Sequence, residues 1–196
     1  MDFKYYDILS SLVLGYAMLM VILYTWNIDY DKDMQIGYLA VAYILGYMIN
    51  ALGGLIEKYL NWGRMPSDRL LTLKKGKNYT GYSRIKFYDA PFVIEKLRDE
   101  LKDPQASTKK MFSRAMSYSN ADTNTRVPDF NAQYAFSRTL LTTMIVSSIL
   151  IIINNYTDWR AYVVMIELTA LCWNRYIERG FYYAREVLIE YTKKKR

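Results

Sequence analysis

The chain lacks histidine altogether and contains a single cysteine, Cys172. An internal disulfide is therefore impossible, and zinc ribbons, histidine-based acid–base catalysis and Ser–His or Cys–His nucleophile pairs are excluded. Glycine-rich phosphate loops, Gly-x-Ser-x-Gly elbows and paired acidic metal sites are also missing from the sequence. We therefore expect a protein that is not an enzyme and that holds no cofactor or metal.

Charge is missing from three long stretches, residues 8–26, 34–56 and 139–157. A helix needs roughly 20 apolar residues to cross a bilayer core of about 30 Å, and these stretches reach that length. A fourth and shorter stretch, residues 161–174, contains one carboxylate. The pattern predicts an all-α fold, namely an integral membrane four-helix protein with a helical cytosolic insertion and a long C-terminal helix.

Charge is distributed unevenly between these stretches. Residues 57–137 contain fifteen Lys and Arg against nine Asp and Glu, residues 175–196 carry a net charge of +4, and the loop 27–35 carries −2. Because positive loops stay on the cytoplasmic side, both termini are predicted to be cytosolic in a multi-pass protein of the inner membrane. The predicted parts are a transmembrane hairpin (1–56), a basic cytosolic helical segment (57–137), a second transmembrane hairpin (138–174, spans 139–157 and 160–174) and a cytosolic helical tail (175–196).

Turn residues and helical periodicity divide the basic segment further. A helix is predicted from Asp89, as its cap, to Lys102, followed by a second over residues 107–118. Residues 63–81 and 119–128 are predicted to be loops, because glycine, proline and asparagine interrupt them. A third helix is predicted to start near Asp129 and to lead into the third span. After Trp159 no proline interrupts the chain, which predicts one long helix over residues 160–196.

Small residues recur every four positions in the second span, and the first span offers a matching face. Such residues let two helices approach closely in lipid. The pattern leaves open whether the contact lies within one chain or between subunits. The predicted helix-packing residues are Ser11, Gly15, Ala42, Gly46 and Gly54.

Glu167 is the one carboxylate predicted to lie inside a span, where an ionised group costs a few kcal/mol. Counting from the external ends of the spans places Ser147, Ser148 and Tyr43 near its depth, and Asn50 is a further intramembrane polar group. One interpretation is a protonated or hydrogen-bonded carboxylate inside the helix bundle. The other is a pore-lining or proton-sensing group.

Basic residues near the predicted inner membrane surface allow two interpretations. In the first, they set the orientation of the chain in the membrane and attract anionic lipid headgroups. Nucleic-acid binding is the alternative, because Arg84, Lys86 and Phe87 alternate with tyrosines in residues 79–88. The predicted partners are membrane lipid and further copies of the chain, with a soluble nuclease or a nucleic acid at the basic face as an open alternative. The predicted inner-interface arginines are Arg138, Arg175, Arg179 and Arg185.

The order of two spans, a basic middle and two further spans ending in residues 176–196 resembles the small membrane accessory proteins of Cas13b-type (type VI-B) CRISPR loci and of other bacterial phage-defence loci. The resemblance covers the whole chain in span pattern and size. It implies a membrane activity, namely oligomerisation, permeabilisation or modulation of a soluble nuclease partner. A small constitutive channel, transporter-like protein or scaffold unrelated to defence is the alternative.

Overall fold

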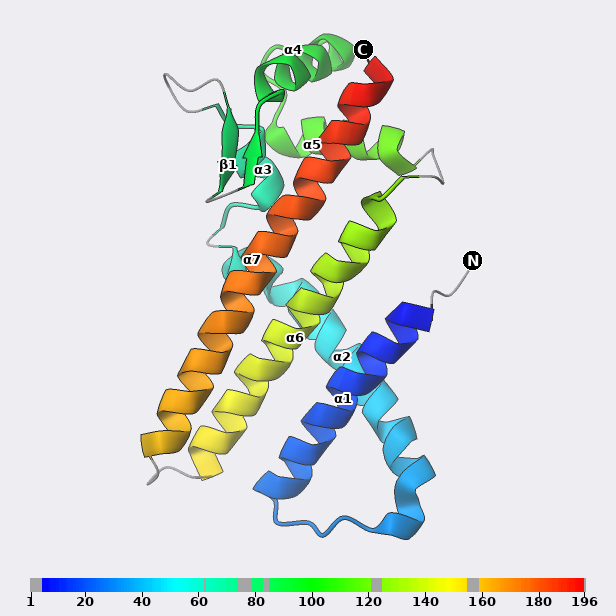
Figure 1. Cartoon of the computed structure of the whole chain (residues 1–196), viewed down its shortest axis with the longest axis vertical. Coiled ribbons are helices and arrows are strands. Elements are labelled where there is room, and N and C mark those ends of the chain that lie inside the picture. Colours follow the sequence, from blue (N-terminus) through cyan, green and yellow to red (C-terminus); the bar gives the residue numbers. More distant parts are fainter. Residues whose placement is uncertain are drawn as a thin grey trace. The chain divides into compact units, whose positions relative to one another are not determined.

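Helices make up most of the structure. The computed structural model describes residues 5–61, 63–73, 79–82, 85–120, 125–154 and 159–195. The predicted all-α class is confirmed for these residues, with one small β-hairpin added (Figure 1). In chain order the elements are α1 (Tyr5–Thr25), the 3-10 turn η1 (Lys32–Met34), α2 (Gln35–Leu60), α3 (Pro66–Leu70), β1 (Thr80–Tyr82), β2 (Ile85–Phe87), α4 (Ala90–Leu101), α5 (Thr108–Asn120), α6 (Val127–Asn154) and α7 (Trp159–Lys195).

The chain divides into two compact units, and each is built from two separate parts of the sequence. Unit 1 comprises Met1–Glu57 and Ala135–Tyr176, whereas unit 2 comprises Lys58–Tyr134 and Ile177–Arg196. Both α6 and α7 therefore contribute residues to both units.

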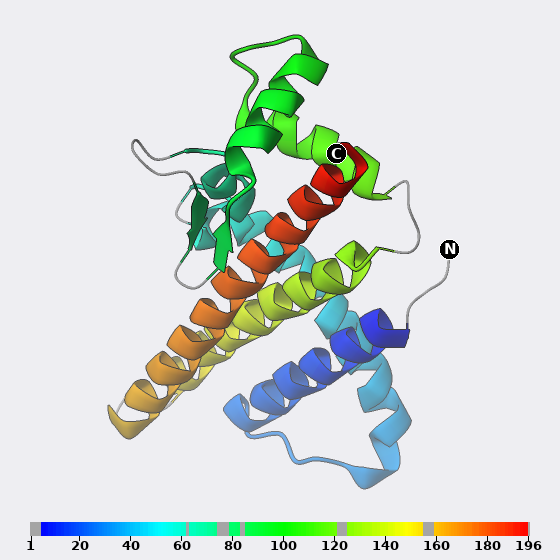
Figure 2. The same cartoon turned by 45° about the horizontal axis from the view of Figure 1, so that its top comes forward.

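Unit 1 contains the apolar helices. Within it α1 and α2 form an antiparallel hairpin, and the first half of α7 lies beside the second half of α6 (Figure 1, Figure 2). Two segments, Lys32–Leu60 and Val127–Asn154, are long and apolar enough to cross a membrane, and the apolar segment Ser11–Thr25 is shorter. Two of the four predicted spans thus meet the length and composition of a membrane helix, and membrane crossing by any of the four stays a prediction.

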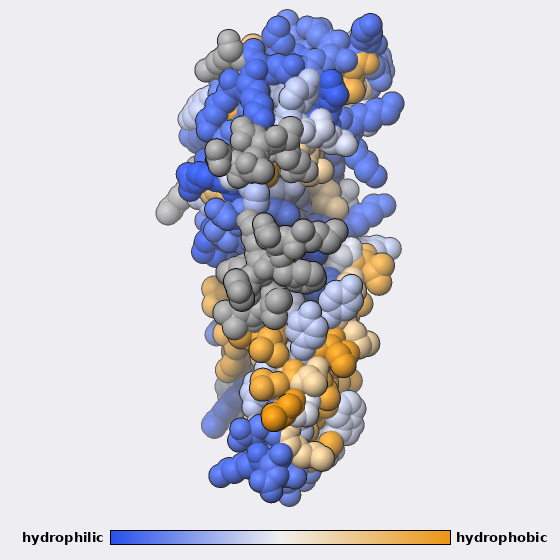
Figure 3. Space-filling model, turned by 90° about the vertical axis from the view of Figure 1, so that its right-hand side faces the viewer, coloured by the Kyte–Doolittle hydropathy of each residue, from blue (hydrophilic) through white to orange (hydrophobic). Residues whose placement is uncertain are grey.

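The surface of unit 1 is unusually apolar. Only 22% of the most apolar window of α2 and 33% of that of α6 are buried. Large side chains such as Ile36, which is 85% exposed, and Leu55, which is 78% exposed, point outward, and the face seen in Figure 3 carries a broad band of apolar side chains. Soluble monomers rarely expose a continuous apolar area of this kind. An apolar environment around unit 1, such as lipid or another protein surface, would remove this area from water.

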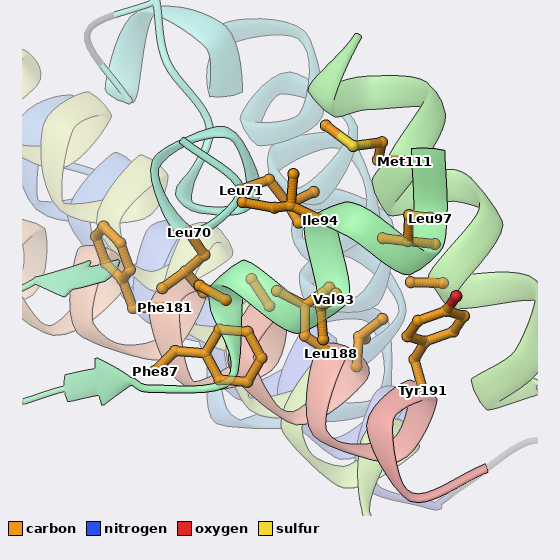
Figure 4. Packing of buried hydrophobic residues seen from close by; sticks show 14 of the residues in the cluster. Leu70, Leu71, Phe87, Val93, Ile94, Leu97, Met111, Phe181, Leu188 and Tyr191 are labelled. Carbon is orange, nitrogen blue, oxygen red and sulfur yellow. The ribbon is translucent and has the colours of Figure 1, made fainter. Parts of the chain in front are cut away.

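Unit 2 has its own hydrophobic core. The inward face of α4 presents Val93, Ile94 and Leu97, which pack with Leu188 and Tyr191 of α7 (Figure 4). These α4 positions recur at helical spacing, so one face of the helix is apolar and the other is charged. Fully burying a side chain of this size contributes roughly 1.5–3 kcal/mol to the free energy of unfolding. Leu188 and Tyr191 of α7 therefore contribute a substantial part of the stability of this core.

The helix predicted from Asp89 to Lys102 is confirmed as α4, although the Asp89 side chain makes no capping hydrogen bond. The second predicted helix is confirmed as α5, which continues to Asn120. The long helix after Trp159 is confirmed as α7, with Tyr176, Val187 and Tyr191 on its buried side. Continuous helical periodicity without proline is thus a reliable guide in this chain.

The two loop predictions for the basic segment were wrong in part. Residues 63–81 contain α3, whose first turn is closed because the Asp68 carboxylate accepts a hydrogen bond from the Met65 backbone NH at 3.2 Å. They also contain β1, which pairs antiparallel with β2. Residues 119–128 contain the start of α6 at Val127, because Pro128 is tolerated in a first helical turn. The lysines of residues 74–77 lie outside the described residues.

The end of α7 is bound to α4 and α5 by charged and aromatic groups around Glu100. The Glu100 carboxylate pairs with Lys195 at 2.7 Å and accepts hydrogen bonds from Tyr191 at 3.1 Å and from Arg114 at 3.2 Å. Burial alone would raise the pKa of Glu100, but the hydrogen bonds from Lys195, Tyr191 and Arg114 outweigh it and hold the pKa below its usual value. The ionised carboxylate therefore stabilises unit 2.

Replacing this carboxylate by an amide should show its contribution. Glu100→Gln is expected to lower the free energy of unfolding at pH 7 by about 1 kcal/mol, because the amide still accepts hydrogen bonds but loses the charge. Since the pKa is lowered by folding, this advantage of the wild type is complete above about pH 4.5, the ordinary value, and is lost as the pH falls further. Thermal unfolding of both proteins from pH 7 to pH 3 measures the difference.

Glu95→Gln is the matched control, because Glu95 lies on the exposed face of the same helix. Its unfolding should follow that of the wild type at every pH. If the stability difference between the wild type and Glu100→Gln stays constant as the pH falls, the charge of Glu100 does not have the role given to it here.

Candidate functional site

Two helices of unit 1, α1 and α2, approach each other very closely where they cross. A Cβ atom built on Gly15 would lie 1.7 Å from the Ala42 carbonyl oxygen, and one built on Gly46 would lie 1.9 Å from the Ser11 carbonyl oxygen. Both distances are far below van der Waals contact, so only glycine fits at these two positions. Four of the five predicted packing residues meet here, and their contact lies within one chain.

Gly54 does not belong to this contact, since a Cβ atom added to it would have no neighbouring atom within 4 Å, whereas Gly53 packs against α6. The helix has 3.6 residues per turn, so each step of four residues rotates by about 40°, and Gly54 is turned by about 120° from Ala42. Gly53 is turned from Ala42 by only about 20°. A Cβ on Gly53 would lie 2.8 Å from the Thr142 hydroxyl oxygen.

A polar cluster lies beside Gly53, between α2 and α6. The Arg138 guanidinium pairs with the Glu57 carboxylate at 3.0 Å and donates a hydrogen bond to the Asn50 side-chain oxygen at 3.2 Å. The same Asn50 oxygen accepts a hydrogen bond from the Thr139 hydroxyl at 3.0 Å. The side chains of Arg138 and Glu57 are each only 19% exposed. This cluster joins α2 to α6 through charge as well as packing.

Sequence reasoning selected Arg138 and Asn50 separately and missed Glu57. A signal was present, because Glu57 directly follows the second predicted span and Arg138 directly precedes the third. Two opposite charges at the same predicted membrane surface can pair whatever their distance along the chain. The Nε atom of Arg138 is buried without a hydrogen-bond partner, so this guanidinium is only partly satisfied by the residues that the structure describes.

The prediction that Glu167 lies inside the bundle was wrong, because its side chain is exposed. Its neighbour Thr169 makes the contact with α6, through a 3.1 Å hydrogen bond between its hydroxyl and that of Ser148. Residues two positions apart on a helix point in directions about 200° apart. Glu167 therefore points away from α6.

The polar residues expected at the depth of Glu167 do not form one site. Ser148 also donates a hydrogen bond to the Met144 carbonyl oxygen at 2.6 Å. Ser147 is buried, with its hydroxyl 3.6 Å from the Met18 sulfur of α1, whereas Tyr43 is 41% exposed on α2. A common polar lining made of these residues is thus excluded within one copy of the chain.

The predicted inner-interface arginines do not gather at one level either. Arg175 and Arg185 are ten residues apart on α7, which is about 15 Å along the helix axis. Arg175 is exposed, Arg179 hydrogen-bonds with the Gln133 side chain, and Arg185 lies 5.2 Å from the ring centre of Tyr182. Each arginine therefore has its own surroundings.

The aromatic residues of the segment 79–88 serve mainly to build unit 2. Phe87 is only 3% exposed, and Tyr82 stacks on Phe181 with ring centres 4.9 Å apart. Lys86 lies over the Tyr79 ring at 5.3 Å. Phe87 cannot stack on a nucleic-acid base, and Arg84 lies outside the described residues.

Unit 2 contains a cleft of about 670 Å³ on the side formed by α3, β1 and the start of α5. Two arginines, one aspartate, threonines and two tyrosines line it. Its volume is within the range of pockets that hold small molecules. No direct signal in the sequence pointed to this cleft, because its residues come from one predicted loop (63–81), from Tyr82 directly after it and from Thr108 near the start of a predicted helix.

Comparisons of the chain with protein-family models, with curated proteins and with solved structures found no match.

Proposed function

We propose that this chain is a non-enzymatic protein of the bacterial inner membrane that acts as a homo-oligomer, as an accessory or effector of antiviral defence. Four helices cross the membrane in this proposal, with both termini in the cytosol. The excess of positive charge in residues 57–137 and 175–196 supports that orientation. The apolar outer surface of unit 1 supports a membrane location.

The exposed Glu167 is the observation that carries the oligomer. It lies on an outward face of α7 together with Val164, which is 52% exposed, and Leu171, which is 66% exposed. Lipid would surround this face in a monomer, and a carboxylate facing lipid costs a few kcal/mol. Contact with a second copy removes that cost if the copy supplies a hydrogen-bond donor.

Tyr43 of α2 is a suitable donor. Glu167 is eight residues from the start of α7 at Trp159, and Tyr43 is eight residues from the start of α2 at Gln35. Both lie about 12 Å from the same end of their helices, so they match in depth when two copies stand side by side. Because α7 of one copy meets α2 of the next, the contact is heterologous, and it closes into a ring when the rotation between neighbouring copies divides a full turn evenly.

Single cysteines placed on the two faces test this contact. Leu171→Cys and Tyr47→Cys, each twelve residues from the start of its helix and each in a Cys172→Ser background, should form crosslinked dimers only when the two variants are expressed together. Ile149→Cys, which is exposed on α6, is the control and should not crosslink with either variant. Crosslinking of each variant with itself, or of the control to the same extent, would reject the α7–α2 contact.

A substitution at the polar position and one at a neighbouring apolar position then separate the role of the Glu167 carboxylate from that of packing. Glu167→Leu is expected to weaken association about tenfold, because an interhelical hydrogen bond in lipid contributes about 1–2 kcal/mol. Val163→Leu on the same face should leave association unchanged. Size measurement across a dilution series in neutral detergent gives both values, and equal association of wild type and Glu167→Leu would contradict the proposal.

The defence role needs a separate experiment in cells. Expressed with its neighbouring genes and challenged with phage, the wild type should increase protection or depolarise the membrane, and Glu167→Leu should lose this effect while still inserting. Ion flux without phage or partner would instead favour a constitutive channel. Unchanged protection after deletion of the gene would leave a scaffold role.

A further inference from the structure

The cleft in unit 2 contains two arginines, Arg64 and Arg69, that have no carboxylate partner among the described residues. Arg69 makes one long hydrogen bond, at 3.4 Å, to the Asn61 carbonyl oxygen. Most of the guanidinium donors of this pair therefore remain available to a ligand.

The single carboxylate in the cleft does not neutralise these arginines. One oxygen of Asp68 accepts a hydrogen bond from the Met65 backbone NH at 3.2 Å, and the other accepts one from the Thr108 hydroxyl at 2.5 Å. Asp68 is thus engaged in closing α3 and in holding it to α5. The charge of the lining side chains is positive by one.

The walls of the cleft are held in place by the core. The Thr80 hydroxyl donates to the Leu70 carbonyl oxygen at 2.7 Å, which ties β1 to α3. Tyr82 is fixed by its stacking on Phe181, with an angle of 9° between the ring planes. A rigid wall lowers the entropy lost when a ligand binds.

We infer that this cleft binds a phosphate-bearing ligand through Arg64 and Arg69. Two guanidinium groups suit a phosphate, which carries close to two charges and three acceptor oxygens, whereas one arginine is enough for a carboxylate. The ligand is either the headgroup of an anionic phospholipid, because Arg64 follows α2 by only four residues, or a soluble phosphate ester. This inference does not depend on the oligomer, since every lining residue belongs to unit 2.

Titration of the full-length protein in neutral detergent tests the inference and separates the two sources. One arm uses ATP without divalent cations, and the other uses mixed micelles of phosphatidic acid, whose headgroup is a phosphate monoester, or, for comparison, phosphatidylcholine. Salt is kept at about 0.15 M, so that attraction between distant charges is largely screened. One saturable site per chain is expected, for ATP if the ligand is soluble and for phosphatidic acid alone if it is a lipid.

Substitutions in the cleft decide whether this site is the one described. Arg64→Gln and Arg69→Gln should each weaken binding at least about tenfold, whereas Arg98→Gln, an exposed arginine of α4, should change it less than twofold. Arg64 is exposed, and its side chain makes no hydrogen bond, ion pair or ring contact with a described residue, so its substitution should not disturb folding. Absence of saturable binding in both arms, or equal weakening by Arg98→Gln, would overturn the inference.

Discussion

Gly46→Leu should destabilise unit 1 by at least about 3 kcal/mol. The new Cβ would lie 1.9 Å from the Ser11 carbonyl oxygen, and this neighbour is backbone, so α1 and α2 must separate. Overpacking of a tight contact typically costs 1–3 kcal/mol even when only side chains have to move. Unfolding of the purified protein in mixed micelles, with increasing sodium dodecyl sulfate, measures the loss.

The chain provides two controls for this substitution within the same helix. No atom lies within 4 Å of the Cβ positions of Gly37 and Gly54. Leucine forms helix better than glycine by somewhat less than about 1 kcal/mol, so Gly37→Leu and Gly54→Leu should be neutral or slightly stabilising. Equal destabilisation by Gly54→Leu and Gly46→Leu would show that the close crossing of α1 and α2 is not the cause.

The second large effect is expected at the ion pair between α2 and α6. Arg138→Met removes the counter-charge of the Glu57 carboxylate and one of the two donors to the Asn50 side-chain oxygen, and Glu57→Leu removes the counter-charge of the guanidinium. Removing one partner of a largely buried pair costs about 3–5 kcal/mol. Each single variant should therefore be strongly destabilised in the same unfolding experiment.

The double variant provides the decisive comparison. Replacing both charges by apolar residues of similar size is often neutral, so Arg138→Met with Glu57→Leu should recover most of the stability lost in either single variant. Lys58→Met, at an exposed position next to Glu57, is the control and should have little effect. If the free energy of unfolding lost in the double variant equals the sum of the losses in the two single variants, the pair does not act as a unit.

The helices could be predicted from the sequence because their signal is local. The uncharged run of α2 and the proline-free run of α7 extend over many residues, so a few atypical positions do not hide them. The strands β1 and β2 are three residues each, too short for an alternating pattern to stand out. Their stability comes from contacts with α3 and α7, which no local pattern contains.

The direction of a polar side chain was harder to predict than its depth. The depth of a side chain follows from counting residues along its helix, and the count correctly places Glu167 in α7 and Ser148 in α6. Direction depends on which face of the helix meets a neighbour, and Thr169 rather than Glu167 lies on that face. The same reason explains why Gly53 and not Gly54 contacts a neighbouring helix. Because a helix has 3.6 residues per turn, residues spaced four apart gradually rotate around the helix axis.

The discontinuous construction of unit 2 has a consequence for biosynthesis. Its α4 core residues are made long before Leu188 and Tyr191, which complete the core. At translation rates of roughly 5–20 residues per second, several seconds pass between the synthesis of Leu97 and that of Tyr191. During this interval the apolar face of α4 has no partner from α7, and a chaperone that shields it would prevent aggregation while α6 and α7 are still being synthesised.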